Sequence, residues 1–160
     1  MNSNLMNKKR CGFSLIELVI VVVIIGIIGA IAIPRLSRGA EGASDSALAG
    51  DLAVMRNALD LYATEHGGTY PSATNATFVA QLTTYTDANG NTNATKTGAY
   101  IYGPYLRSVP ALKVGDEKGS TTVAATAGVG VGWIYDSSAG TIVPNTGTDT
   151  DASGKPYNTY

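Results

Sequence analysis

The sequence contains very few of the residues that build disulfide bonds, metal centres and nucleophilic active sites. Cys11 is the only cysteine among 160 residues, which excludes an intrachain disulfide bond. His66 is the only histidine, so no Cys/His metal cluster can form, and no serine or cysteine neighbours it in a nucleophile motif. No phosphate-binding loop or pair of catalytic carboxylates is recognisable. We therefore expect no catalytic residues, no enzymatic activity and, apart from the calcium site considered below, no cofactor.

A strong net charge is also absent from the chain. The formal net charge is −1 at pH 7, and the one basic cluster is formed by residues 8–10. A nearly neutral chain creates no long-range field that would attract nucleic acid or anionic lipid. We therefore expect no nucleic-acid partner. The length suits one globular domain with an appendage.

An apolar segment of membrane-spanning length dominates the N-terminal part. Residues 13–33 contain one charged side chain, Glu17, and residues 18–33 form an uninterrupted apolar run. About 20 helical residues span the hydrocarbon core of a bilayer. The short basic flank before the segment predicts a cytoplasmic N-terminus, with everything after a single membrane-spanning helix on the outer side.

Two common kinds of N-terminal signal account poorly for this pattern. A secretory signal would be cleaved after residues 30–32, but Pro34 follows closely, the apolar segment is long and Glu17 stays unexplained. A lipoprotein signal would place its cysteine after the apolar segment. Cys11 lies before the segment, so this second kind of signal is excluded.

The order of residues around Gly12 fits a third kind of signal. A short basic leader, residues 8–12, ends in Gly12 and is followed by Phe13 and Ser14. Glutamate is the fifth residue after Gly12, and Pro34 is the twenty-second. This arrangement resembles the class III signal of the type IV pilins and of the pseudopilins of type II secretion. The resemblance implies that a membrane prepilin peptidase cuts between Gly12 and Phe13 and methylates the new amine of Phe13.

Glu17 has a physical rationale within this resemblance. A charge at the bilayer centre costs roughly 2.5 to 3.5 kcal/mol on insertion scales, and less near an interface. In a filament, the Glu17 carboxylate of one subunit would meet the cationic Phe13 amine of a neighbour. Any docking height that leaves either charge unpaired would then be penalised, so Glu17 would set the register of assembly. The alternative is an acid that reaches the membrane surface from a helix end.

A long helix should continue beyond the membrane. Pro34 removes one backbone donor, which predicts a kink or local loosening. After it, apolar side chains recur at steps of four and three, which places them on one helical face: Leu48, Leu52, Met55, Leu59 and Tyr62. Two glycines at 67–68 should end the helix near Glu65 as a left-handed C-cap. His66, at this helix end, is expected to be a cap or a surface residue.

The residues after this helix are rich in small and polar types and predict short elements. The expected elements are a helix from Thr74 or Asn75 to about Thr84, a polar loop at 87–97, an edge strand at 99–106, and a hairpin with strands at 129–135 and 141–143 around a loop at 136–140. The predicted fold class is α+β: a long N-terminal helix with a small antiparallel sheet packed on its second half, as in the pilin fold.

The expected organisation has four segments along the chain. They are a removed leader at 1–12, a transmembrane and filament-core helix at 13–34, an amphipathic second half of that helix at 35–66, and a β-rich globular domain at 67–160. The resemblance implies an inner-membrane protein with a single span, whose assembled filament lies in the periplasm or at the cell surface. Membrane lipid would surround the helix before assembly.

The resemblance also predicts a function without chemistry. Residues 55–72 resemble the end of the long helix in major pseudopilins, which favours a filament subunit of a type II secretion-like system. The alternatives are a major or minor pilin of a type IV pilus and a membrane-tethered binding module. The implied partners are further copies of the chain, the prepilin peptidase, and an inner-membrane assembly platform with its ATPase.

The C-terminal part contains a pattern of alternating oxygen side chains. Asp149, Asp151 and Ser153 precede Gly154, as in the first half of an EF-hand calcium loop, but the closing glutamate position falls on Tyr160. A true EF-hand is therefore excluded. The resemblance to major pseudopilins, which have a calcium site in a C-terminal loop, implies calcium at these residues. The other interpretation is a polar, turn-rich tail, for which Asp, Ser and Gly are common.

Overall fold

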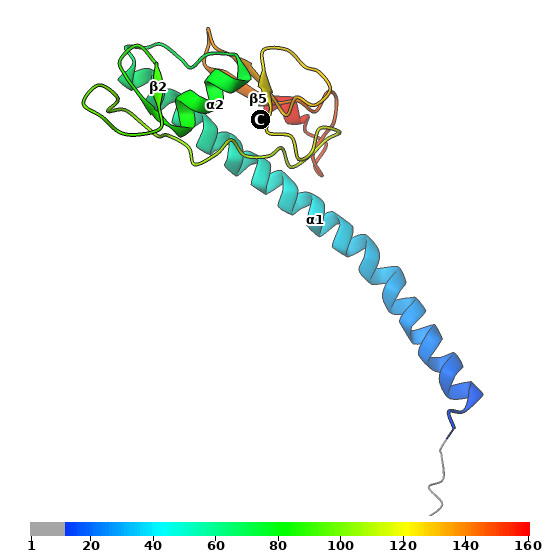
Figure 1. Ribbon diagram of the computed structural model, residues 1–160. Coiled ribbons are helices and arrows are strands. Elements are labelled where there is room, and N and C mark those ends of the chain that lie inside the picture. The colour runs from blue at the N-terminus through cyan, green and yellow to red at the C-terminus, as the bar shows by residue number, and fades with distance from the viewer. Residues whose placement is uncertain (1–11) are drawn as a thin grey trace, which may run out of the picture. The chain divides into compact units, whose positions relative to one another are not determined.

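The structure, a computed structural model, describes residues 12–160 and contains one long helix, short helices and two small sheets (Figure 1). The helices are α1 (Leu15–Glu65), α2 (Asn75–Thr83) and the 3-10 helix η1 (Tyr157–Thr159). The chain divides into two compact units, one ending at Gly39 and one spanning Ala40–Tyr160. Of the expected leader, residues 1–11 lie outside the described residues.

The first unit consists of the apolar part of α1. Its large apolar side chains are exposed, from 45% for Val21 to 82% for Leu15. By length and composition this helix is able to cross a membrane. The helix continues through Pro34 without interruption, and the kink expected there stays a prediction.

In the second unit, the predicted apolar face of α1 is confirmed. Leu48, Leu52, Met55, Leu59 and Tyr62 are each at most 2% exposed. Their spacing of four and three residues places them on one side of the helix, which is the side that the rest of the unit covers. Burying each such side chain contributes roughly 1.5 to 3 kcal/mol.

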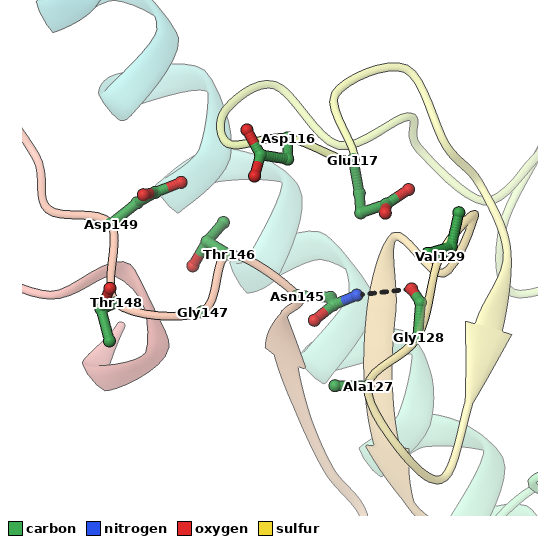
Figure 2. Close-up of a pocket in the computed structure, with 10 residues that line it drawn as sticks. All are labelled: Asp116, Glu117, Ala127, Gly128, Val129, Asn145, Thr146, Gly147, Thr148 and Asp149. Atoms are coloured by element: carbon green, nitrogen blue, oxygen red, sulfur yellow. Dashed lines mark hydrogen bonds between the residues drawn. The ribbon is translucent and has the colours of Figure 1, made fainter.

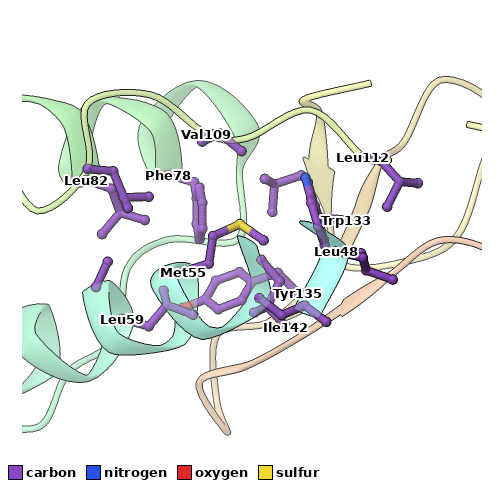
Figure 3. Close-up of a cluster of buried hydrophobic side chains, with 14 of the residues drawn as sticks. Leu48, Met55, Leu59, Phe78, Leu82, Val109, Leu112, Trp133, Tyr135 and Ile142 are labelled. Carbon is purple, nitrogen blue, oxygen red and sulfur yellow. The ribbon is translucent and has the colours of Figure 1, made fainter. Parts of the chain in front are cut away.

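The core of the second unit is built from α1, α2 and the larger sheet (Figure 3). Phe78 of α2 packs edge-to-face against Tyr135, with ring centroids 4.8 Å apart. The polar ends of the buried aromatic residues find backbone partners. Trp133 Nε1 donates to the Pro110 carbonyl at 2.9 Å, and the Tyr135 hydroxyl donates to the Pro71 carbonyl at 3.0 Å. These bonds fix the loops on either side of the core.

The predicted glycine cap at the end of α1 is confirmed. Gly67 and Gly68 have φ angles of 64° and 86°, which are left-handed values. The Gly68 N–H donates to the Ala63 carbonyl at 2.7 Å and so satisfies a carbonyl of the last turn. The chain therefore reverses at the end of the helix and leads towards α2.

The position of α2 is confirmed, but its capping differs from the prediction. Thr74 occupies the N-cap position, yet its side chain makes no capping hydrogen bond. The Asn75 side-chain oxygen instead accepts from the Val123 N–H at 2.9 Å. This residue therefore links α2 to the first strand of the larger sheet.

The larger sheet has the order β3-β4-β5, with β3 at Val123–Ala124, β4 at Trp133–Asp136 and β5 at Thr141–Pro144. The predicted β4–β5 hairpin is confirmed and antiparallel, with a loop of residues 137–140 because Asp136 pairs with Thr141. The expectation of a wholly antiparallel sheet is wrong, since β3 pairs parallel to β4. The short connection at 125–132 is long enough to return the chain to the start of β4, because the two parallel strands pair over only two residues.

Other strand boundaries also differ from the prediction. The strand expected at 129–135 begins only at Trp133, and residues 129–132 belong to a loop. The segment expected as an edge strand at 99–106 makes one isolated bridge, from Tyr102 to Thr86. Within the expected polar loop, β2 (Thr92–Asn93) pairs with β1 (Tyr85–Thr86) as a second, two-stranded sheet.

Gly140 provides a test of the packing of the hairpin turn. It has a φ angle of 67°, and a Cβ atom there would overlap the ring of Tyr70. Gly147 has a comparable φ angle of 57° but nothing within 4 Å of an added Cβ. Both alanine variants carry the strain of a left-handed residue, about 1 to 3 kcal/mol.

We expect Gly140→Ala to lower the melting temperature of the full chain in detergent clearly more than Gly147→Ala, because only Gly140→Ala also displaces the ring of Tyr70. Circular dichroism during heating measures this difference. Equal melting temperatures for the two variants would show that the turn does not pack on Tyr70 as described.

Candidate assembly site

The expected processing and assembly residues lie at the start of α1. Gly12, Phe13 and Ser14 precede the helix and are exposed. The peptide bond between Gly12 and Phe13 is thus outside regular structure, where proteases cleave most readily. The Ser14 carbonyl accepts from the Leu18 N–H at 3.2 Å, which starts the hydrogen-bonding pattern of the helix.

Glu17 lies in the first turn of α1 and is exposed. A carboxylate is favoured at this end of a helix, because the macrodipole is positive there. It is the only charged side chain from position 12 to position 34. Residues 13–33 would extend about 32 Å as a helix, close to the thickness of a hydrocarbon core of about 30 Å. The carboxylate therefore lies near one end of a segment that matches a bilayer.

The structure brings two of the three expected calcium ligands together, in a turn. The Asp151 carboxylate accepts from the Ser153 N–H at 2.8 Å, the Ser153 hydroxyl at 2.6 Å and the Lys155 N–H at 2.9 Å. Its second oxygen accepts from the Tyr160 hydroxyl at 2.5 Å. These hydrogen bonds, that of the Ser153 hydroxyl first, hold the pKa of Asp151 well below its ordinary range.

The third expected ligand is Asp149. It borders a pocket of about 490 Å³ together with Asp116, Glu117 and Thr146 (Figure 2). The three acids surround a wide opening, and within residues 12–160 no three Asp, Glu, His or Cys side chains are arranged to hold a metal ion. Calcium binding at Asp149, Asp151 and Ser153 stays a prediction.

Sequence reasoning missed two polar residues of α1 that fasten residues 149–160 to the helix. The Asp45 carboxylate accepts from the Tyr157 hydroxyl at 2.6 Å and from the Ala152 N–H at 3.2 Å. The Arg56 guanidinium donates to the Tyr160 carbonyl at 2.9 Å and to the Ile142 carbonyl at 3.2 Å. The partners are 86 to 112 residues apart in the chain, so no local pattern announces them.

The single histidine is part of the end of α1. His66 is 7% exposed, which excludes the surface position, and its Nδ1 lies 2.8 Å from the Tyr62 carbonyl, as in a helix cap. Its ring stacks on the Tyr62 ring at 3.8 Å. These contacts give His66 a structural role.

The comparison with protein families decides the nature of the N-terminal segment. Residues 7–33 match the family model of the prokaryotic N-terminal methylation motif. The segment is a class III signal of the pilin and pseudopilin kind. Proteins with this signal are processed by a prepilin peptidase and assemble into pilus-like filaments. Comparisons with curated proteins and with solved structures gave no match.

The pilin-type signal overlaps the first part of α1. An α+β unit packs its small sheets on the second part of the same helix whose first part follows the signal. The signal and the apolar helix together fit membrane anchoring. The matched residues include the three at which processing and pairing were predicted, Gly12, Phe13 and Glu17.

The turn around Asp151 predicts how the stability of the second unit depends on pH. Because folding lowers the pKa of Asp151, the contribution of its carboxylate to folding stability is fully present above the ordinary pKa of 3.8. This contribution is lost as the pH falls below 3.8. Conversely, the hydrogen bond to Asp151 raises the pKa of Tyr160 from 10.0 to about 12. The contribution of the Tyr160 hydroxyl to folding stability is therefore present below pH 10 and is lost as the pH rises through 12.

We expect Asp151→Asn to melt at a lower temperature than the unaltered chain at pH 7, and we expect this difference to disappear as the pH falls below 3.8. Asp116→Asn removes another exposed carboxylate and is the matched control, with a small effect at either pH. Thermal melts of the full chain in detergent across this range give the comparison. A difference that persists unchanged at low pH would contradict the role assigned to the carboxylate.

Proposed function

We propose that the chain is a structural subunit of a helical, pilus-like filament. In this proposal, a prepilin peptidase removes residues 1–12 and methylates the amine of Phe13, and the mature subunit waits in the inner membrane with its N-terminus towards the cytoplasm. An assembly platform with its ATPase then moves subunits from lipid into the filament. The observation that carries the proposal is the methylation motif followed by an apolar helix that the described chain leaves exposed.

The free energy of apolar burial supports this arrangement. Sixteen large apolar side chains between Phe13 and Leu36 are at least 45% exposed. At roughly 1.5 to 3 kcal/mol for each one that becomes buried, the total reaches tens of kcal/mol. This exceeds the 5 to 15 kcal/mol by which a domain is typically stable. Lipid covers such a helix before assembly, and only helices of the same kind would cover it equally well afterwards.

Glu17 and the Phe13 amine set the register in this proposal. Once the helices leave the bilayer for the apolar centre of a filament, each carboxylate is desolvated unless it meets a cation. The amine created by cleavage is the nearest cation in the motif, because residues 14–34 contain no basic side chain. A neighbour that offers its amine at the right height satisfies both charges. Pro34, which lacks a backbone N–H, would allow the helix to loosen as it is packed.

Within this class, we favour a pseudopilin of a type II secretion-like system, because residues 55–72 resemble the end of the long helix in major pseudopilins. The alternative is a major or minor pilin of a type IV pilus. The two differ in abundance and place. A scarce filament that stays in the envelope supports the pseudopilin, whereas an abundant filament that can be sheared from the surface supports the pilin.

Processing gives the first test of the proposed function. The purified protein should begin at Phe13 and carry one methyl group on its amine. Intact mass measurement with N-terminal sequencing decides this. A start at Ile33 would indicate an ordinary secretory signal, and an uncut Met1 would leave the chain as a membrane-tethered module; either result would refute the proposal.

Glu17 gives the second test, through assembly. Glu17→Gln keeps the size of the side chain and removes its charge, so processed protein should accumulate in the membrane while filament yield falls at least tenfold. Removing one partner of a desolvated pair typically costs about 3 to 5 kcal/mol, which corresponds to a much larger equilibrium loss. Asp116→Asn removes an exposed carboxylate outside the apolar segment and is the control. Filaments of normal yield from Glu17→Gln, counted by electron microscopy, would contradict the register role.

A further inference from the structure

One loop of the second unit presents a valine to solvent. The Val129 side chain is 99% exposed, more than any other large apolar side chain among the described residues. It lies in the connection at 125–132 between β3 and β4, and residues 119–135 contain no charged side chain. The loop thus carries an apolar tip without the charges that usually keep exposed loops in solution.

This tip is held in place from both sides. The Gly130 N–H donates to Glu117 at 2.8 Å, and the Ser120 hydroxyl donates to the Gly130 carbonyl at 2.6 Å. On the other side, the Asn145 amide donates to the Gly128 carbonyl at 3.0 Å (Figure 2). It also donates to the Val131 carbonyl at 2.8 Å. Val129 therefore lies between anchored residues, and little conformational entropy would be lost when it docks.

A groove lies at the hairpin turn of the same sheet. Its volume is about 390 Å³, and α1 residues Arg56 and Asp60 form one side. The other side is formed by residues of the β4–β5 turn and β5, together with Tyr70: Ala139, Gly140, Thr141, Ile142 and Val143. The close approach of Gly140 to the Tyr70 ring gives the groove a firm wall.

The tip and the groove lie at opposite ends of β4. Residues 128–130 precede the strand, whereas Ala139 and Gly140 follow it, and the strand's four residues span about 13 Å. The tip therefore cannot reach the groove of its own subunit. A contact between two patches at different places on one molecule is heterologous, and when it repeats it generates either a closed ring or an open helical array.

The small size of this contact decides what can occupy the groove. Stable interfaces between free proteins bury about 1,200 to 2,000 Å² in total, and a single loop tip supplies only a small part of that. An occupant must therefore be brought to the groove by a larger interface. The described chain offers one, the exposed apolar part of α1, which copies of the same chain would share.

We propose that Val129 of one subunit docks into the groove beside Tyr70 and Ala139 of a neighbouring subunit. The contact rests on the proposed filament. It fixes the rotation of the second unit of one subunit against that of the next, and apolar packing of the helices supplies most of the binding. Each contact becomes effective because the helices raise the local concentration of its partner.

Disulfide cross-linking in assembled filaments tests the contact. In a chain with Cys11→Ser, the pair Val129→Cys and Ala139→Cys should give a ladder of covalent oligomers after mild oxidation. A disulfide within one subunit is excluded because the two positions stand at opposite ends of β4, beyond the 7 Å that a disulfide allows between Cα atoms. The control pair, Val129→Cys with the exposed Lys96→Cys, should stay monomeric under the same conditions.

A second measurement uses a charge in the tip. Val129→Asp should yield filaments that shear into pieces at least severalfold shorter than those of the control Thr126→Asp, which places the same charge elsewhere in the loop. Filaments that form without the ladder and shear like the control would overturn the inference and leave the proposed function standing. Cross-linking of Val129→Cys to itself would also overturn it, because it indicates a two-fold contact. Complete absence of filaments from the unaltered chain would refute both.

Discussion

Within the described chain, nothing covers the apolar side chains of residues 13–33. Every large apolar side chain of this segment is about half exposed or more. In water this exposure would cost more free energy than a domain of this size gains by folding. The apolar segment therefore needs cover from outside the described chain, and in the proposed assembly that cover changes from lipid to other copies of the same helix.

In the second part of the same helix, the apolar face from Leu48 to Tyr62 is buried. There, Leu48, Met55 and Tyr62 are buried within the second unit, and Asp45 and Arg56 hold residues 149–160 in place. Most large apolar side chains of this unit are buried, and Val54, Leu61, Ile101 and Val129 are about half exposed or more. In the proposed filament, Val129 and the groove beside Tyr70 would adjust the fit between subunits, and the helices would hold the subunits together.

The sequence predicted the features that depend on local order. The helix face from Leu48 to Tyr62, the glycine cap and the β4–β5 hairpin follow from periodicity and turn chemistry, and the methylation motif is a contiguous run. The parallel pairing of β3 was missed because two-residue pairing leaves no alternation to read. The bonds of Asp45 and Arg56 join residues about a hundred positions apart, and the exposure of Val129 depends on the anchors around it.

The proposed exchange of lipid for other copies of the apolar helix can be measured at one position. A photo-activated cross-linking residue in place of Ile24 would report what touches that side chain in the membrane-bound pool and in sheared filaments. The account predicts adducts with lipid in the first pool and with residues 13–33 of another subunit in the second. Lipid adducts alone in both pools, or adducts with an unrelated protein, would contradict it.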